Sequence, residues 1–392
     1  MKPKRNWGIR MAQREIHFGV IGCGLMGREF ASAAARWCHL VNLDFVPRIV
    51  AACDLNRNAV DWFTTSIPGL RLATVDYHEL LADKAIEAIY CAVPHNLHKQ
   101  IYIDTIQAGK HLLGEKPFGI DLPANQAILE AVRQNPGVLV RCSSQFPFFP
   151  GAYQIVQWIR EQRFGQIMEV EAGFWHSSDL DPNKPINWKR QISTNGEYGC
   201  MGDLGVHVVH IPYRFGWRPS SLKAFLSKIV KDRPDKEGRR VPCETWDNGV
   251  IACEVASQDQ QFPMFLSFKR IAPGHANTWF IRIQGTRLSA EFTTRNPKQL
   301  LSLPYTPGGA QEWRVVDIPY RSAYETITGG IFEFGFSDAI LQMWAAFCDE
   351  IIHGPDMKQF FSCVTPEETA ASHKLFTGAL ESQRTNQVVR LA

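Results

Sequence analysis

The chain has 392 residues, of which 45% are apolar and 21% charged, and its formal net charge is +3. These values are typical of soluble globular proteins, and the length predicts about two domains because single cores rarely grow past roughly 250–300 residues. The small net charge, with acidic and basic residues interleaved, argues against a nucleic-acid partner. Residues 1–14 differ, because they hold five basic and no acidic residues. They are interpreted as a solvated tail or, alternatively, as an arm that wraps a partner subunit.

Ten cysteines are scattered singly, and no two of them form a Cys-x-x-Cys pair. Cys53 and Cys91 lie within apolar runs, so the cysteines are interpreted as small buried residues in a reducing compartment, and no metal site is expected. No apolar stretch reaches the roughly 20 residues of a membrane-spanning helix. The charged N-terminus is not followed by the apolar segment of a secretory signal. We therefore expect a cytoplasmic protein without membrane contact.

Short apolar strands and helices alternate along the first 145 residues. A buried strand is predicted over 16–22, and a helix follows from Leu25 to about Trp37. Further strands are expected over 47–54, 71–76, 85–93, 111–117 and 136–145, and further helices over 54–63, 77–83 and 98–109. Because parallel strands need crossover connections, this alternation predicts a doubly wound parallel sheet with helices on both faces.

After Pro150 the pattern changes to long strand-like runs without intervening helices. One helix is predicted over 152–165, and two more, over 337–354 and 366–383, close the chain. The strand-like runs occupy 166–177, 221–230, 248–257, 262–271 and 278–294. They predict a large, mainly antiparallel sheet with one face covered by helices. The polar segment 232–240 is predicted to be a surface loop.

A glycine-rich turn separates the first predicted strand from the first helix, and its sequence from Gly22 to Gly27 is GCGLMG. In a Gly-x-Gly-x-x-Gly turn the first glycine permits the tight bend, and Gly24 lets the backbone approach a pyrophosphate. Gly27 allows the helix to pack closely on the strand. The helix start at Leu25 and Met26 supplies free N–H groups and a partial positive charge. This combination predicts a Rossmann dinucleotide site.

Asp54 stands at the end of the second predicted strand, 27 residues after Gly27. A carboxylate there can accept hydrogen bonds from ribose hydroxyls and would repel a 2′-phosphate, so NAD is expected rather than NADP. Arg57, three residues further on, argues against a strict preference. In the alternative interpretation Asp54 only caps a helix beside an unrelated glycine-rich turn.

Three further segments, in this order, resemble the Gfo/Idh/MocA family of glucose–fructose oxidoreductase and inositol dehydrogenase. Residues 92–100 resemble the family's Thr-Pro-Asn-x-x-His segment through Pro94, Asn96 and His98. Residues 108–119 resemble its Glu-Lys-Pro segment, and residues 201–210 resemble its Asp-x-Gly-x-His segment. The matching positions are Glu115, Lys116, Pro117, Asp203, Gly205 and His207. The resemblance extends from about residue 16 to residue 392.

The resemblance implies an α/β protein made of a Rossmann domain over 15–146 and an α+β domain over 147–392. The first domain would bind NAD through the glycine-rich turn and Asp54. Further cofactor contacts are implied for Pro94, Asn96, His98, Glu115 and Lys116. The second domain would bind substrate and assemble the chain into a homo-oligomer, a dimer or a tetramer. Lys116 would lie beside the nicotinamide, faced by Asp203 and His207.

The chemistry of alcohol oxidation agrees with these residue types. A secondary alcohol loses a hydride from carbon and a proton from oxygen, and histidine is the most common base for the proton. Asp203 and His207 are four residues apart, so a helix would place them on one face. Asp203 could bind a substrate hydroxyl or orient the imidazole, and Lys116 could stabilise the developing alkoxide. Without the resemblance, the structural interpretation of His207 would be the favoured one.

The segment from Trp175 to Arg190 is expected to border the site, because it joins the second domain's first strand to the Asp203 segment. Its Trp175 and Trp188 suit sugar C–H groups, and His176, Lys189 and Arg190 suit an anionic group. The alternative places the tryptophans in the core and the cations in solvent. Residues 145–150 lack the arginine that the family often carries there, and His210 replaces a frequent aspartate, so the substrate is not defined.

The expected function is NAD-dependent oxidation of a secondary alcohol on a sugar, a polyol or a sugar acid. The alternative is an NAD-dependent glycosidase, which oxidises its substrate transiently, eliminates the aglycone, adds water and returns the hydride; its substrate could be an anionic glycoside. A non-catalytic NAD-binding sensor and a structural interaction protein are further alternatives. Intact Lys116 and His207 argue against the sensor, and the glycine-rich turn argues against the structural protein.

Overall fold

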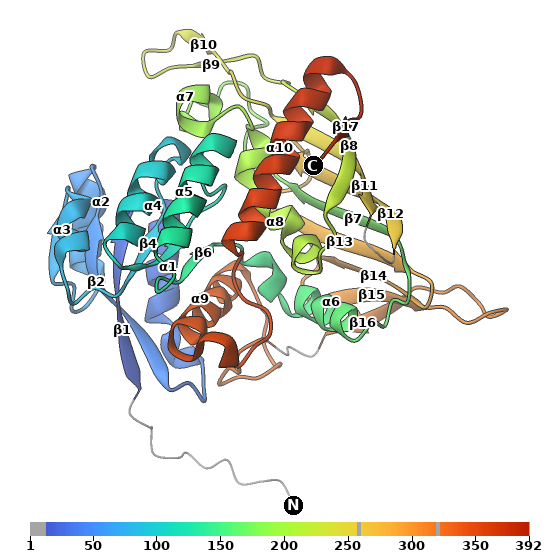
Figure 1. Cartoon of the computed structure of the whole chain (residues 1–392), viewed down its shortest axis with the longest axis horizontal. Coiled ribbons are helices and arrows are strands. Elements are labelled where there is room, and N and C mark those ends of the chain that lie inside the picture. The colour runs from blue at the N-terminus through green and yellow to red at the C-terminus, as the bar shows by residue number, and fades with distance from the viewer. Residues whose placement is uncertain (1–12, 257–259, 319–321, 392) are drawn as a thin grey trace, which may run out of the picture.

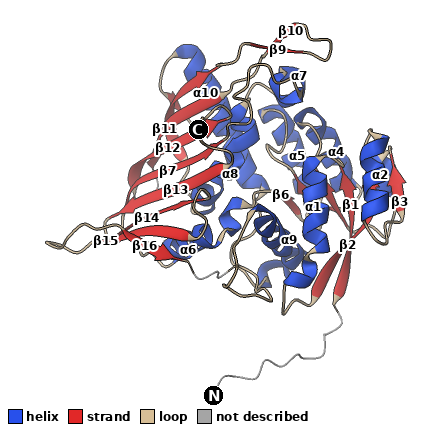
Figure 2. Ribbon diagram, turned by 180° about the vertical axis from the view of Figure 1, so that it is seen from behind, coloured by secondary structure: helices blue, strands red, loops and turns tan. Residues whose placement is uncertain are grey.

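The computed structural model describes residues 13–256, 260–318 and 322–391, which form two sheets with helices packed between and around them (Figures 1 and 2). Most of the basic tail expected over residues 1–14 lies outside these residues. Its last member, Arg14, already belongs to the first strand, β1 (Arg14–Ile21). The strand therefore begins two residues earlier than the apolar run, because Arg14 and Glu15 already pair with Phe45 and Val46 of the neighbouring strand.

The first sheet has six parallel strands in the order β3-β2-β1-β4-β5-β6. The strands after β1 are β2 (Phe45–Cys53), β3 (Leu72–Thr74), β4 (Ala88–Cys91), β5 (His111–Gly114) and β6 (Val140–Cys142). The helices between them are α1 (Leu25–Ala35), α2 (Arg57–Ser66), α3 (Tyr77–Ala82), α4 (His98–Gln107) and α5 (Leu122–Gln134). This is the predicted doubly wound sheet, and its strand order reverses between β1 and β4, where such sheets bind dinucleotides.

A helix from the far end of the chain completes this layer. Helix α9 (Phe336–His353) packs beside α1 against the sheet. Its Trp344 ring lies 5.2 Å from the Phe18 ring of β1 and 3.7 Å from the Phe30 ring of α1, measured between centroids. All three side chains are buried. The core of the first sheet is therefore closed by residues that come long after its last strand.

The second sheet has nine strands in the order β16-β15-β14-β13-β7-β12-β11-β8-β17. They are β7 (Ile167–Trp175), β8 (Pro219–Ser227), β11 (Asn248–Ala256), β12 (Gln261–Lys269), β13 (Thr278–Gly285), β14 (Leu288–Thr293), β15 (Gln299–Pro304), β16 (Arg314–Asp317) and β17 (Val389–Arg390). Every neighbouring pair is antiparallel except β7 and β12. Three helices cover its inner face, α6 (Pro150–Arg160), α8 (Cys200–Arg214) and α10 (Pro366–Thr385) (Figure 2).

The polar segment predicted to be a loop is instead a two-stranded ribbon of β9 (Asp232–Pro234) and β10 (Arg240–Pro242). Asp235 closes its turn by accepting hydrogen bonds from the backbone N–H groups of Glu237 and Arg239, both at 2.9 Å. Arg233 is buried and donates to main-chain carbonyls of the segment after β7. The polar segment thus forms two paired strands, and its Arg233 holds the loop after β7 in place.

Of the ten cysteines, all of which have free thiols, only Cys38 is exposed. Within the described ranges, no helix combines the length and apolar character needed to cross a membrane. The same ranges contain no cluster of three histidine, cysteine or acidic side chains arranged to hold a metal ion.

Candidate active site

The glycine-rich turn joins β1 to α1 and leaves room for a ligand at the helix start. Gly22 has a φ of +97°, and a Cβ on it would lie 2.4 Å from the carbonyl oxygen of Ala92. A Cβ on Gly27 would lie 2.1 Å from the carbonyl oxygen of Gly22, whereas a Cβ on Gly24 would meet no atom within 4 Å. No side chain caps α1. The residues present therefore fit a dinucleotide, because there is open space at Gly24 and the backbone N–H groups at the start of α1, at Leu25 and Met26, are free.

Asp54 lies directly after β2 and reaches back to the turn. One carboxylate oxygen accepts a hydrogen bond from the Cys23 N–H at 2.8 Å, and the other accepts from the Asn56 N–H at 2.8 Å. Each oxygen keeps a second acceptor position for a ribose hydroxyl. The capping residue of α2 is Asn56, which accepts from the Asn58 N–H at 3.1 Å. The alternative in which Asp54 caps a helix is therefore wrong.

Two of the residues expected at the cofactor have internal hydrogen bonds. Glu115 is buried after β5, where its carboxylate accepts from the Tyr90 hydroxyl at 2.9 Å and from the Ser143 hydroxyl. His98 is buried at the start of α4, with Nε2 3.1 Å from the Val93 carbonyl oxygen. Both side chains stabilise the strand ends beside the site, whereas the ammonium of Lys116 extends across the site to Asp203.

The match of Asn96 to the asparagine of the Thr-Pro-Asn-x-x-His segment is wrong by one position. In Thr-Pro-Asn-x-x-His the asparagine follows the proline directly, and His95 occupies that place, whereas Asn96 is exposed. The His95 side chain is buried in the short helix η2 (His95–Leu97), and its Nδ1 lies 3.0 Å from the Asn195 carbonyl oxygen. That carbonyl can only accept, so Nδ1 carries the proton and Nε2 is left as an acceptor. The ring stands edge-on to Trp188, 5.0 Å between centroids.

Asp203 binds side chains that come from both sheets. It lies in the first turn of α8, is 2% exposed, and forms ion pairs with three cations. Its Oδ1 lies 2.8 Å from Lys116 Nζ, which comes from the first sheet, and 2.9 Å from Lys189 Nζ. Its Oδ2 pairs with Arg270, which follows β12. Burial lowers the pKa of Lys116, and Arg270 adds to the effect, while the nearby Glu115 opposes it.

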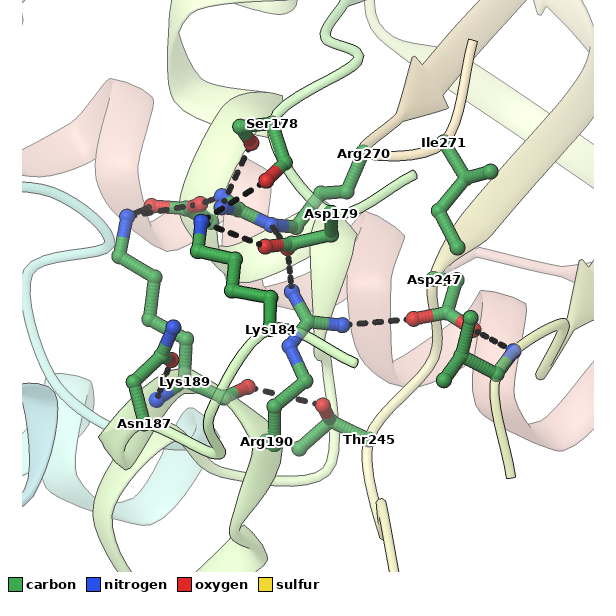
Figure 3. A network of polar contacts seen from close by, with 12 residues as sticks. Ser178, Asp179, Lys184, Asn187, Lys189, Arg190, Thr245, Asp247, Arg270 and Ile271 are labelled. Atoms are coloured by element: carbon green, nitrogen blue, oxygen red, sulfur yellow. Dashed lines mark hydrogen bonds and ion pairs between the residues drawn. The ribbon is translucent and has the colours of Figure 1, made fainter. Parts of the chain in front are cut away.

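Behind Arg270 the charges continue in a buried chain (Figure 3). Arg270 Nε donates to Asp179 at 2.6 Å, Arg190 donates to the same carboxylate at 2.5 Å, and Arg190 also donates to Asp247 at 2.6 Å. Burial disfavours the charged form of Asp179, but Arg270 and Arg190 outweigh it and lower its pKa. Arg190 is 1% exposed. The expectation that it binds an acidic substrate is therefore wrong, because both ends of its guanidinium face internal carboxylates.

His207 lies one turn after Asp203 on α8, as the spacing predicts, and is 4% exposed. Its Nδ1 is 3.2 Å from the Ser144 hydroxyl, and its ring stands edge-on to Phe146 at 5.2 Å and Phe174 at 5.7 Å between centroids. Burial, followed by the charges of Lys116 and other neighbours, lowers its pKa well below the ordinary value. The imidazole is therefore neutral at neutral pH and able to accept a proton.

Trp175 and His176, both expected to bind substrate, lie on opposite sides of the second sheet. Trp175 is on the outer face of the second sheet, where its Nε1 donates to the Ser267 hydroxyl at 2.7 Å. It is turned away from the site, because Phe174 before it faces His207 and successive strand residues alternate. His176 remains on the site side, its ring 4.7 Å from Phe174. Burial lowers the pKa of His176 to about 4, and the positive charges of Arg270, Lys189 and Lys116 add to this effect.

Three site residues were not identified from the sequence. Arg270 directly follows an apolar strand, and nothing in the neighbouring sequence shows that it reaches Asp203. Ser144 stands in the Cys-Ser-Ser segment after β6, where a short polar run at a strand end gave a weak signal. His95 could have been found, because it directly follows Pro94 in the segment that was singled out.

Comparison with known proteins agrees with this arrangement. A family model described as "Oxidoreductase family, NAD-binding Rossmann fold" matches residues 16–141, and the "GFO/IDH/MocA C-terminal domain" matches residues 153–291. Levoglucosan dehydrogenase of Pseudarthrobacter phenanthrenivorans is 26% identical over 57% of each chain. Glucose-6-phosphate 3-dehydrogenase of Bacillus subtilis is 24% identical over 56% of this chain and 60% of its own. The chain thus spans somewhat more than half the length of these curated relatives.

Solved structures share the whole fold. A levoglucosan dehydrogenase in complex with NADH superposes with a TM-score of 0.84 at 21% identity, covering 97% of this chain and 100% of the other. An oxidoreductase domain protein from Kribbella flavida gives a TM-score of 0.87 at 19% identity, with the same coverage. Together with the two family matches, these findings show that the chain belongs to the Gfo/Idh/MocA family of oxidoreductases and carries its NAD-binding Rossmann domain.

Proposed function

We propose that this protein is an NAD-dependent dehydrogenase that oxidises a secondary alcohol of a sugar, a polyol or a sugar acid. The observation that carries the proposal is the meeting of Lys116, Asp203 and His207 between the two sheets, with Lys116 Nζ 2.8 Å from Asp203. A base, a hydrogen-bond donor and a carboxylate acceptor are the groups that alcohol oxidation needs. The names of the relatives, two of them sugar dehydrogenases, support a carbohydrate substrate.

Each residue has a defined part in this reaction. NAD held by the glycine-rich turn and Asp54 would supply the hydride acceptor for the substrate carbon. Neutral His207 takes the hydroxyl proton on Nε2, which requires that Nδ1–H donates to Ser144, 3.2 Å away. Lys116 donates a hydrogen bond to the same substrate oxygen and stabilises its developing negative charge. Asp203 holds the lysine in place and can accept a hydrogen bond from a neighbouring substrate hydroxyl.

The test is incubation with NAD and a panel of free sugars, polyols, sugar acids and aryl glycosides, following NADH and released aglycone together. Formation of NADH from free sugars supports the dehydrogenase. Aglycone release without net NADH would instead support the alternative, an NAD-dependent glycosidase. Binding of NAD with no turnover of any panel member would favour a sensor over an enzyme.

We also propose that the chain assembles into a homo-oligomer through the outer face of the second sheet. Phe225, Val250 and Phe265 are exposed there, on the neighbouring strands β8, β11 and β12. Adjacent exposed apolar side chains on a flat sheet face are typical of a subunit contact. Light scattering coupled to gel filtration measures the mass, and a Phe225→Glu variant should shift it to that of the monomer.

A further inference from the structure

The cluster around Asp203 holds more positive than negative charge. Lys116, Lys189 and Arg270 all contact this one carboxylate. Buried charges are normally paired one to one, because an uncompensated ion in a low dielectric is costly. Three other buried carboxylates, Asp179, Asp247 and Glu115, therefore decide how much of this positive charge is compensated.

Two of the three cations have a second carboxylate. Arg270 donates to Asp179 at 2.6 Å, and Lys116 follows Glu115, whose negative charge favours the charged lysine. Asp179 and Asp247 are themselves bound by Arg190, at 2.5 and 2.6 Å. The histidines that face the cluster do not change this balance, because burial and the neighbouring cations lower the pKa values of His95, His176 and His207. Lys189 contacts both oxygens of Asp203, at 2.9 and 3.0 Å, but it shares this carboxylate with Lys116 and Arg270, and its other favourable carboxylate, Asp179, is already paired with two arginines.

Lys189 is also the member of the trio that a ligand can reach most easily. Its side chain is 27% exposed, against 15% for Lys116 and 8% for Arg270. It belongs to the short helix η4 (Trp188–Arg190), and its Nζ lies 5.5 Å from the centroid of the Trp188 ring. The Trp188 ring is half-buried between His95 and the lysine. An aromatic ring beside an ammonium that shares its carboxylate with two other cations suits the C–H surface of a sugar that carries an anionic group.

We propose that the substrate carries an anionic group, a carboxylate or a phosphate on the sugar or polyol, and that Lys189 binds it while Trp188 contacts the sugar ring. This inference rests on the proposed function, because it assigns the substrate class of the same site. Lys116 stays with the reacting oxygen, and Lys189 exchanges part of its contact with Asp203 for the ligand.

Binding of such a ligand has a protonic signature. Burial, then Arg270 and Lys116, lowers the pKa of Lys189 well below its ordinary value in the free protein. An anion bound to the ammonium raises that pKa again, so at alkaline pH binding takes up a proton. A lysine with a purely structural role would give no such uptake.

The experiment is calorimetric titration of the full chain with NADH bound, at pH 7 and pH 9, in two buffers of different ionisation enthalpy. The probes are matched pairs: glucuronate and glucose, galacturonate and galactose, gluconate and glucitol, glucose 6-phosphate and glucose. The acidic member of at least one pair should bind about 10- to 100-fold more tightly, with proton uptake at pH 9. Lys189→Met should remove the preference and the uptake.

Lys184→Met is the matched control. Lys184 lies in the same loop, pairs with Asp179 at 3.3 Å and donates to the Ser178 carbonyl oxygen at 2.8 Å, so removing it leaves the contacts of Lys189 with Asp203 in place and this variant should keep the preference. If Lys189→Met does not fold, the salt dependence of the wild-type protein decides: affinity for the acid should fall with ionic strength, and affinity for its neutral partner should not.

Two results would overturn the inference: a panel in which no acid binds better than its neutral partner, or a preference that survives in Lys189→Met. Neither result touches the proposed function, which fails only if the panel gives no NADH. Oxidation of neutral sugars with no acid preference would leave the dehydrogenase standing and remove the anion site.

Discussion

The environment of His207 determines the protonation state in which it acts. A base must be neutral, and burial beside Lys116 places the pKa of His207 below the ordinary 6.5. Activity should therefore persist as the pH falls through 6.5 and disappear only at lower pH. His207→Gln should lower kcat/KM by about 10²–10⁴ and remove this acid limb, while leaving NADH affinity unchanged. A pH series of kcat/KM with a fluorescence titration of NADH checks both, and an unchanged acid limb in the variant would assign it to another group.

Asp54 controls the choice of dinucleotide through its charge. Its oxygens already accept from Cys23 and Asn56, so it is held where a ribose would bind. Asp54→Ala should weaken NAD binding and narrow the gap to NADP, because it removes both the attraction and the repulsion. Asp54→Asn separates charge from hydrogen bonding, since one side-chain oxygen remains. Calorimetry with both cofactors measures the gap, and tighter binding of NADP to the wild type would contradict the assignment.

Arg190 should matter for stability rather than for substrate affinity. Removing it leaves Asp179 and Asp247 without one of their buried partners, and breaking such a pair costs about 3–5 kcal/mol. Urea unfolding of Arg190→Ala should show this loss. Arg239→Ala, which removes the ion pair of a surface arginine with Asp235, should cost much less. If Arg190→Ala were as stable as the wild type but had a raised KM, the residue would belong to the substrate site after all.

At the scale of the element, two glycines of the β1–α1 turn should serve different purposes, Gly24 in NAD binding and Gly27 in folding. Around Gly24 there is space in the protein, so Gly24→Ala should fold normally but lose most NAD affinity as its Cβ enters the pyrophosphate space. Gly27→Ala should destabilise the domain, because its Cβ would lie 2.1 Å from the Gly22 carbonyl oxygen. Thermal unfolding and NAD titration of the two variants distinguish these effects. A Gly24→Ala protein that binds NAD normally would move the phosphates away from this turn.

The accuracy of sequence-based prediction also differs among elements. The alternation of strands and helices predicted the first sheet, and the spacing of Asp203 and His207 predicted their shared helix face, because both patterns are local. Phe174 and Trp175 were predicted in a strand, but the sequence does not say which side of that strand faces the site. The Arg270–Asp203 contact could not be predicted, since strand order decides which loop end reaches α8.

At the scale of the whole molecule, the predicted boundary at residue 146 would cut through a shared core. Phe18, Phe30 and Trp37 all pack on Trp344 of α9. A fragment of residues 1–146 should therefore aggregate, and Trp344→Ala in the full chain should cost about 3–5 kcal/mol. Light scattering of the fragment and denaturant unfolding of the variant test this. A soluble fragment with native NAD affinity would show that the first sheet does not need its distant cover.

The position of β7 in the second sheet has a consequence for biosynthesis. Both of its neighbours, β12 and β13, come from residues after 260, so a nascent chain presents two unpaired edges of β7 while the ribosome makes the intervening segment. Unpaired edges are templates for pairing with other chains. Newly made copies on crowded polysomes are thus most exposed to aggregation during this interval.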